Sequence, residues 1–166
     1  MKVHIDMNYS TPPTEATWDD YIEQQPGNID LPYAKRRFFN KTHNEVFAGF
    51  KSNVIERTDE LHFMPMELFS YYIQYYFEYI QTGVYQTHKM EDRWFFRGEV
   101  SSCFLGLIKE KLDEYPVESQ SMKQDLLDTV DYMLQNIDHF NSEDNIEVYG
   151  DAVQKLKHIK ALTENL

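Results

Sequence analysis

The chain of 166 residues is 42% hydrophobic and 27% charged, values typical of a soluble globular protein, and it is long enough to bury a sizeable core within one domain. An aromatic content of 15% argues against disorder, and the single cysteine, Cys103, excludes an internal disulfide. The net charge of −12 disfavours nucleic acid as a partner, because phosphates are repelled by an acidic surface.

Residues 1–30 are predicted to form an irregular N-terminal arm. A Pro-Pro pair and a Pro-Gly pair within this segment mark turns. Between them, Thr14 or Thr17 is placed to cap a short helix that carries Trp18 and Tyr21. From residue 31 onward the pattern is helical.

Residues 32–57 are predicted to form one long helix or two short ones. Pro32 suits the first turn of a helix. Apolar residues then recur at spacings near three and four, at Phe39, Val46, Phe47, Phe50, Val54 and Ile55.

The next helix is rich in tyrosine, begins after Pro65 and ends at Gly83. Eleven of the fifteen residues from Met66 to Ile80 are apolar or aromatic. The polar positions, Glu67, Ser70, Gln74, Glu78 and Gln81, lie on one narrow stripe. We expect a core helix whose tyrosine hydroxyls find partners; the alternative is a partly exposed groove for a partner. A base-stacking platform is disfavoured, since the helix contains no Lys or Arg.

A third helix is predicted over 91–114, ending before Pro116. Its small residues Gly98, Ser102 and Gly106 are four apart and form one row. Such a row allows close packing, and we expect a bulky aromatic from the Tyr71–Tyr79 stretch to fill it.

Two more helices complete the prediction. One covers 121–140, with Ser121 and Gln124 as a capping box, and the other covers 143–163, capped by Asn141 or Ser142. The predicted fold is therefore all-α, a single-domain bundle of about five helices over 31–166 preceded by the arm.

Charge is strongly segregated along the chain. Residues 31–57 carry a net charge of +4, whereas residues 113–151 carry eleven acids and one base, a net charge of −10. The acidic stretch is a solvated face, a partner for the basic segment, or a surface that captures a basic protein. For the last case the candidate binding residues are Asp125, Asp128, Asp131, Asp138, Glu143, Asp144, Glu147 and Asp151.

One short motif suggests catalysis. The segment from Arg57 to His62 has an arginine and a histidine separated by four residues, and Arg37 with His43 nearly repeats the pattern. The motif resembles the catalytic motif of HEPN-type ribonucleases, which are also all-α. The resemblance covers six residues and implies RNA cleavage by Arg57 and His62, but Thr58 stands where that family usually has Asn, Asp or His.

Metal and cofactor sites are not expected. Asp59 with His62, and His88 with Glu91, are the best local pairs, but a di-iron bundle needs two Glu-x-x-His units and further carboxylates.

These observations lead to one leading function and two alternatives. We expect a cytosolic, non-enzymatic binding protein, since no signal-peptide-like apolar run follows Met1 and no stretch is long enough to span a membrane. Its most plausible role is an immunity-type or antitoxin-type inhibitor of a basic toxin. The alternatives are a HEPN-like ribonuclease and a DNA mimic, whose carboxylates would be spaced like phosphates. The pattern does not define the oligomeric state or the partner.

Overall fold

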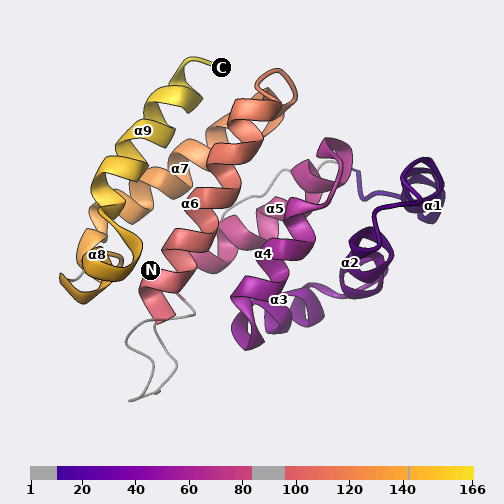
Figure 1. Cartoon of the computed structure of the whole chain (residues 1–166), viewed down its shortest axis with the longest axis horizontal. Helices are drawn as coiled ribbons and strands as arrows, with labels where there is room; N and C mark the ends of the chain where they lie inside the picture. Colours follow the sequence, from indigo (N-terminus) through magenta and orange to yellow (C-terminus); the bar gives the residue numbers. More distant parts are fainter. Residues whose placement is uncertain (1–10, 84–95, 142) are drawn as a thin grey trace. The chain divides into compact units, whose positions relative to one another are not determined.

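The fold is all-helical throughout the residues that the structure describes. The structure is a computed structural model that describes residues 11–83, 96–141 and 143–166, with side chains for 11–83, 98–141 and 146–166. In these residues the chain forms nine α-helices and two short 3-10 helices (Figure 1). The all-α prediction is therefore confirmed, but the prediction of about five helices is wrong.

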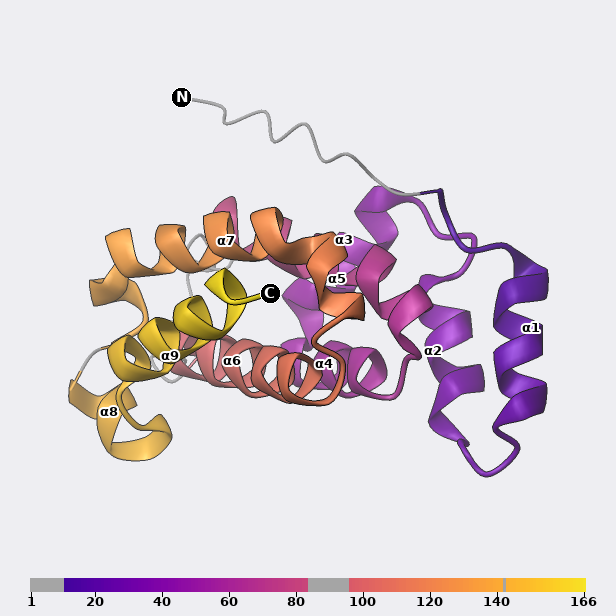
Figure 2. The ribbon, with the colours of Figure 1, turned by 90° about the horizontal axis from the view of Figure 1, so that it is seen from above.

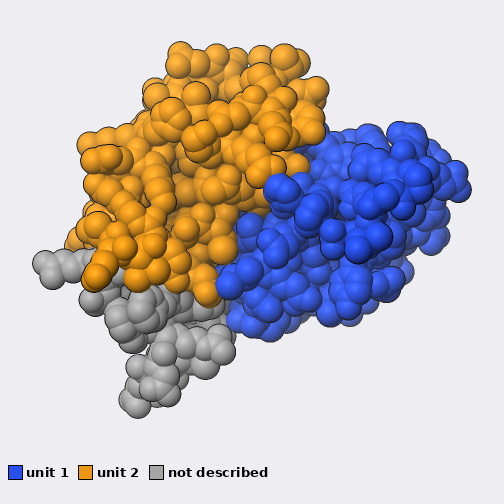
Figure 3. All heavy atoms as spheres, in the orientation of Figure 1, with its two compact units in different colours: residues 1–78 blue, residues 79–166 orange. Residues whose placement is uncertain are grey.

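The chain divides into two compact units, Met1–Glu78 and Tyr79–Leu166, which Figure 3 shows in two colours. Each unit is described separately below. The single-domain organisation expected from chain length stays a prediction.

Unit 1 begins with the helix α1, Glu15–Gln24. Thr14 caps it, because its Oγ1 accepts a hydrogen bond from the Thr17 amide at 3.2 Å. Trp18 on this helix is fully buried. The short helix predicted inside the N-terminal arm is thus present, and residues 1–10 lie outside the described part.

Three helices, and not one or two, follow in the segment predicted as 32–57. They are α2 (Asp30–Phe38), α3 (His43–Ser52) and α4 (Val54–His62). Asn40 has φ of 53°, a left-handed conformation that ends α2, and Thr42 then starts α3 through a capping box with Glu45. Asn53 starts α4, since its Oδ1 accepts a hydrogen bond from the Glu56 amide at 3.1 Å.

The tyrosine-rich helix α5 spans Met66–Gln81, as predicted, with Pro65 before it and Gly83 at φ 62° after it. Tyr72, Tyr75, Tyr76 and Tyr79 are buried, whereas Tyr71 is partly exposed. Burial of these rings agrees with the expectation of a core helix.

Within unit 1 the rings of α5 pack on the preceding helices. The centroid of Tyr72 lies 5.6 Å from that of Trp18 and 5.2 Å from that of Phe38. The Tyr72 hydroxyl accepts a hydrogen bond from Trp18 Nε1 at 3.4 Å. The Tyr76 hydroxyl lies 3.3 Å from Thr58 Oγ1, so buried tyrosine oxygens have polar partners inside the unit.

Unit 2 starts at the last turn of α5 and contains four more α-helices, α6 (Phe96–Glu114), α7 (Lys123–Gln135), α8 (Glu143–Tyr149) and α9 (Ala152–Glu164). The 3-10 helices η2 (Glu118–Met122) and η3 (Ile137–His139) flank α7. Figures 1 and 2 both show α9 running alongside α6 and α7, which agrees with the contacts between these helices.

The two C-terminal predictions need correction at their boundaries. The predicted 121–140 helix begins only at Lys123 without a capping box, because the Ser121 hydroxyl donates to the Glu118 main-chain oxygen at 3.1 Å. The predicted 143–163 helix is divided into α8 and α9 at Gly150, which has φ of 78°. Asn141 Oδ1 accepts a hydrogen bond from the Ala152 amide at 3.0 Å and so contributes to the start of α9, and Ser142 lies outside the described residues.

The row of small residues on α6 is open at its C-terminal member, Gly106, whereas Gly98 is buried. Gly106 is exposed, and no atom beyond its own helix and chain neighbours lies within 4 Å of the position that a Cβ would occupy there. Ser102, one turn earlier, is partly exposed. No aromatic side chain of the described residues therefore packs over Gly106, so the expected filling is not found there, and this part of α6 borders an open groove.

No helix in the described ranges combines the length and the apolar character needed to cross a bilayer.

Candidate partner-binding surface

The three aspartates of α7 occupy different environments. The helix buries Leu126, Val130 and Met133, so its polar residues lie on the remaining sides. Asp128 is exposed and accepts a hydrogen bond from Gln124 Nε2 at 2.8 Å.

The other two aspartates of α7 are less available. Asp131 Oδ1 lies 2.6 Å from Lys160 Nζ on α9, which is an ion pair inside unit 2. Asp125 is partly buried, and this burial, followed by repulsion from Asp128, raises the pKa of its carboxyl. Asp128 and Asp131 are therefore accessible to solvent, Asp131 with 44% of its side chain exposed, whereas Asp125 is partly buried.

The remaining candidate binding residues differ in their exposure and in the contacts that they make. Asp138 in η3 and Glu147 in α8 are exposed. Asp151 caps α9, because its Oδ1 accepts a hydrogen bond from the Val153 amide at 2.9 Å. The side chains of Glu143 and Asp144 lie outside the described part.

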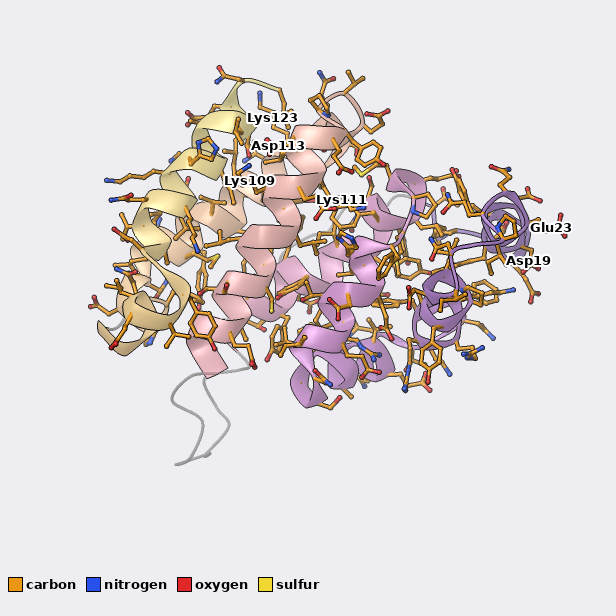
Figure 4. The ribbon with its side chains drawn as sticks, viewed as in Figure 1. Asp19, Glu23, Lys109, Lys111, Asp113 and Lys123 are labelled. Carbon is orange, nitrogen blue, oxygen red and sulfur yellow. The ribbon has the colours of Figure 1, made fainter. Side chains whose placement is uncertain are left out.

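Two further acids of the 113–151 stretch are exposed, although the sequence did not single them out as candidate binding residues. Glu114 ends α6 and Glu118 begins η2, and both are exposed. Their neighbour Asp113, by contrast, forms an ion pair with Lys109 one turn earlier on α6, at 2.5 Å (Figure 4). Sequence spacing of four residues between an acid and a lysine identifies such a pair in advance.

Within the 113–151 stretch, five acids therefore share two properties: each is exposed, and none forms an ion pair in the described part of the chain. We call them the unpaired acids: Glu114, Glu118, Asp128, Asp138 and Glu147. Lys123, the one basic residue of the 113–151 stretch, donates to the Glu164 main-chain oxygen at 3.1 Å. It does not neutralise any of the five.

The basic segment 31–57 finds its ion pairs within unit 1. Lys35 Nζ lies 2.6 Å from Asp19 and 3.3 Å from Glu15, both on α1. Arg37 lies 3.7 Å from Glu56 and 3.9 Å from Glu60. Lys35 and Arg37 therefore pair with acids of unit 1 and not with the acidic residues of the 113–151 stretch.

Arg57 is at the centre of the same network. Its NH2 lies 2.9 Å from Glu56, and its Nε lies 3.0 Å from a carboxylate oxygen of Glu60. Arg57 and Glu60 are only 6% and 5% exposed. A buried guanidinium held by two carboxylates is poorly placed to bind a phosphate of RNA.

The aliphatic part of Arg57 lies over Gly49 of α3. A Cβ at position 49 would be 3.1 Å from Arg57 Cδ, which is closer than carbon atoms pack without displacement. The missing side chain at Gly49 thus makes room for the buried arginine.

Glu60 is electrostatically unusual. The Arg57 Nε contact is within ion-pair distance but lacks hydrogen-bond geometry, so both Glu60 carboxylate oxygens are buried without a hydrogen-bond donor among the described residues. Burial raises the pKa of Glu60 to about 7, and the nearby Arg57 only partly opposes this shift.

His62 and His43, the histidines of the two arginine–histidine motifs, contact different side chains. His62 is partly exposed, and its ring meets the Phe63 ring edge-on at 4.8 Å between centroids. His43 contacts Glu78 through Nε2 at 2.7 Å.

Among the described residues, no group of three or more His, Cys, Asp or Glu side chains is arranged to hold a metal ion. Of the two pairs considered from the sequence, His88 and Glu91 lie outside the described residues.

Comparison with known proteins gives no match: no protein-family model, no curated protein and no solved structure matches this chain.

Proposed function

We propose that this chain is a non-enzymatic binding protein that captures a basic protein through unit 2, and that it acts as an immunity-type or antitoxin-type inhibitor of a basic, nuclease-like toxin. The observation that carries the proposal is the concentration of exposed carboxylates in residues 113–151. Lys35, Arg37 and Arg57 of the basic segment form ion pairs with acids of unit 1, whereas the five unpaired acids form no ion pair in the described part.

Unpaired carboxylates have a defined energetic consequence. Like charges close together repel; at Asp125 the carboxyl pKa is raised first by burial and then by repulsion from Asp128. A cationic surface relieves this repulsion and is attracted over a distance of about 10 Å at 0.1 M salt, so it associates faster than a neutral one. Rapid association is what an inhibitor of a toxin requires.

The arrangement also bears on the alternatives. Arg57 is occupied by Glu56 and Glu60, which weighs against its use as an RNA-binding catalytic group. A folded His62→Ala variant should therefore keep biological activity. Loss of that activity, together with RNA cleavage by the wild-type protein, would favour the HEPN-type alternative and overturn this proposal. A DNA mimic would protect against DNA-binding proteins in general, and competition by duplex DNA for the partner is the measurement that identifies it.

The test uses two variants that remove the same charge from different units. The first, Asp128→Asn/Asp138→Asn/Glu147→Gln, neutralises three unpaired acids of unit 2. The second, Asp20→Asn/Glu23→Gln/Asp59→Asn, neutralises three exposed acids of unit 1, two of them on α1, where Figure 4 labels Glu23. All six side chains are exposed, so each replacement should change stability by less than about 0.5 kcal/mol.

Association rates are measured at low and high ionic strength against the partner, for which the product of the neighbouring reading frame is the first choice. The unit 2 variant should associate about tenfold more slowly at low salt and show a flatter salt dependence, while the unit 1 variant stays close to wild type. Equal slowing of both variants would show that only net charge matters. Unchanged rates for the unit 2 variant would show that its acids are merely a solvated face.

A further inference from the structure

The groove between α6 and α9 has a chemistry unlike the rest of unit 2. It encloses about 430 Å³ and is lined entirely by residues of these two helices. A volume of this size falls in the range of about 300 to 1,000 Å³ that small-molecule sites occupy.

The floor of the groove is apolar. Leu105 on α6 and Ile159 on α9 both line the groove and are only 3% and 1% exposed. Gly106 also lines the groove, and apart from its chain neighbours and its own helix backbone no described atom lies within 4 Å of the position that a Cβ would occupy there. The absence of a side chain at this point is what keeps the groove open.

The rim of the groove is basic. Lys109 on α6 and Lys155 and His158 on α9 contribute to its lining, and no Asp or Glu does. Unit 2 as a whole carries sixteen acids against nine Lys and Arg, a net charge of −7, so a lining without carboxylates differs from its surroundings.

The two lysines are held in place by their own contacts. Lys109 Nζ pairs with Asp113 at 2.5 Å, and Lys155 Nζ donates to the Tyr149 main-chain oxygen. The contact of Lys155 is with a carbonyl oxygen and not with a carboxylate, so Lys155 forms no ion pair in the described part of the chain.

From this combination we propose that the groove binds a small amphiphilic anion, with an apolar body over Gly106 and a carboxylate or similar group at Lys109, Lys155 and His158. The enclosed volume favours a small molecule over a helix of a partner protein, which would need a longer channel. The site uses residues other than the five unpaired acids, so it is independent of the capture of a basic protein.

The first experiment measures binding of decanoate to the full chain by calorimetry and by displacement of the fluorescent anion 1-anilinonaphthalene-8-sulfonate. Decyltrimethylammonium, with the same chain and the opposite charge, serves as the matched ligand. Decanoate should bind at least tenfold more tightly than the cation. Equal affinity for the two, or no binding of decanoate, would overturn the proposal, and so would binding of an acidic amphipathic peptide in place of decanoate.

Two variants localise the binding. Gly106→Leu places a side chain in the open groove and should weaken decanoate binding at least tenfold, with a melting temperature equal to or above that of the wild type, because leucine favours a helix more than glycine does. Lys109→Gln/Lys155→Gln should weaken decanoate several-fold and reduce the preference over the cation. Ala161→Leu and Lys157→Gln, at exposed positions of α9 outside the lining, should change nothing. A folded Gly106→Leu protein with unchanged binding would place the ligand elsewhere and refute the assignment.

Discussion

Glu60 should make the stability of this protein depend on pH in a direction opposite to that of a typical surface carboxylate. Its pKa is about 7 in the folded chain, compared with 4.5 for the same group in an unfolded chain. The folded state therefore binds the proton more tightly than the unfolded state. This contribution to stability is fully present below pH 4.5 and is lost as the pH rises through about 7.

The size of the effect follows from the shift. Each pKa unit corresponds to about 1.4 kcal/mol, so the full effect is about 3 kcal/mol. Between pH 5 and pH 8 the part that is lost is about 2 to 3 kcal/mol. Because glutamine has no titratable proton, Glu60→Gln should remove this part of the pH dependence.

The assay is urea unfolding followed by circular dichroism at pH 5, 6, 7 and 8. The quantity compared is the free energy of unfolding at pH 5 minus that at pH 8, which should be smaller in Glu60→Gln than in wild type by about 2 to 3 kcal/mol. Asp59→Asn is the control, since it removes an exposed carboxylate from the same helix and should leave the difference unchanged. If Glu60→Gln and wild type show the same pH dependence, Glu60 is not a buried, proton-binding group and the reasoning fails.

Three further predictions concern packing. Tyr76→Ala should lower the free energy of unfolding by about 3 to 5 kcal/mol because the Tyr76 ring is fully buried, while Tyr76→Phe should lower it by only about 1 kcal/mol. A change near zero for Tyr76→Ala in chemical denaturation would contradict the burial. Gly106→Ala should raise the free energy of unfolding by up to about 1 kcal/mol, whereas Gly49→Ala should not raise it, because the new Cβ would meet Arg57. Equal gains for the two variants in calorimetric melting would show that position 49 is as open as position 106. Asn40→Val should lower the free energy of unfolding by about 1 to 2 kcal/mol, because residue 40 has a positive φ, whereas Asn40→Gly should not lower it. A melting temperature that is higher for the valine variant than for the glycine variant would exclude the left-handed turn.

The sequence was sufficient where local signals agreed. Pro65, Gly83 and the nearly continuous apolar surface between them defined α5 to within two residues. It was insufficient in the segment 32–57, because apolar spacing continues through breaks that depend on Asn40 and Asn53 adopting non-helical backbone angles.

The candidate surface illustrates a second limit. Counting charges located the acidic stretch, but it did not show that Asp131 pairs with Lys160, a residue 29 positions away, or that Asp151 is used as a helix cap. Pairing across a fold depends on which helices meet, and one sequence contains no direct record of that. For the same reason, the row of small residues on α6 did not show that Gly106 faces an open groove and not an aromatic side chain.

The close approach of Arg57 to Gly49 has a consequence for the evolution of this chain. A residue with a side chain at position 49 forces Arg57 to shift, and a shorter residue at position 57 removes the cation nearest to Glu56 and Glu60, leaving only the more distant Arg37. Neither change is tolerated well alone, so positions 49, 57 and 60 should substitute together among descendants of a common ancestor. Relatives that keep Gly49 are expected to keep an arginine at 57 and an acid at 60, while those that lose the glycine should carry an uncharged pair.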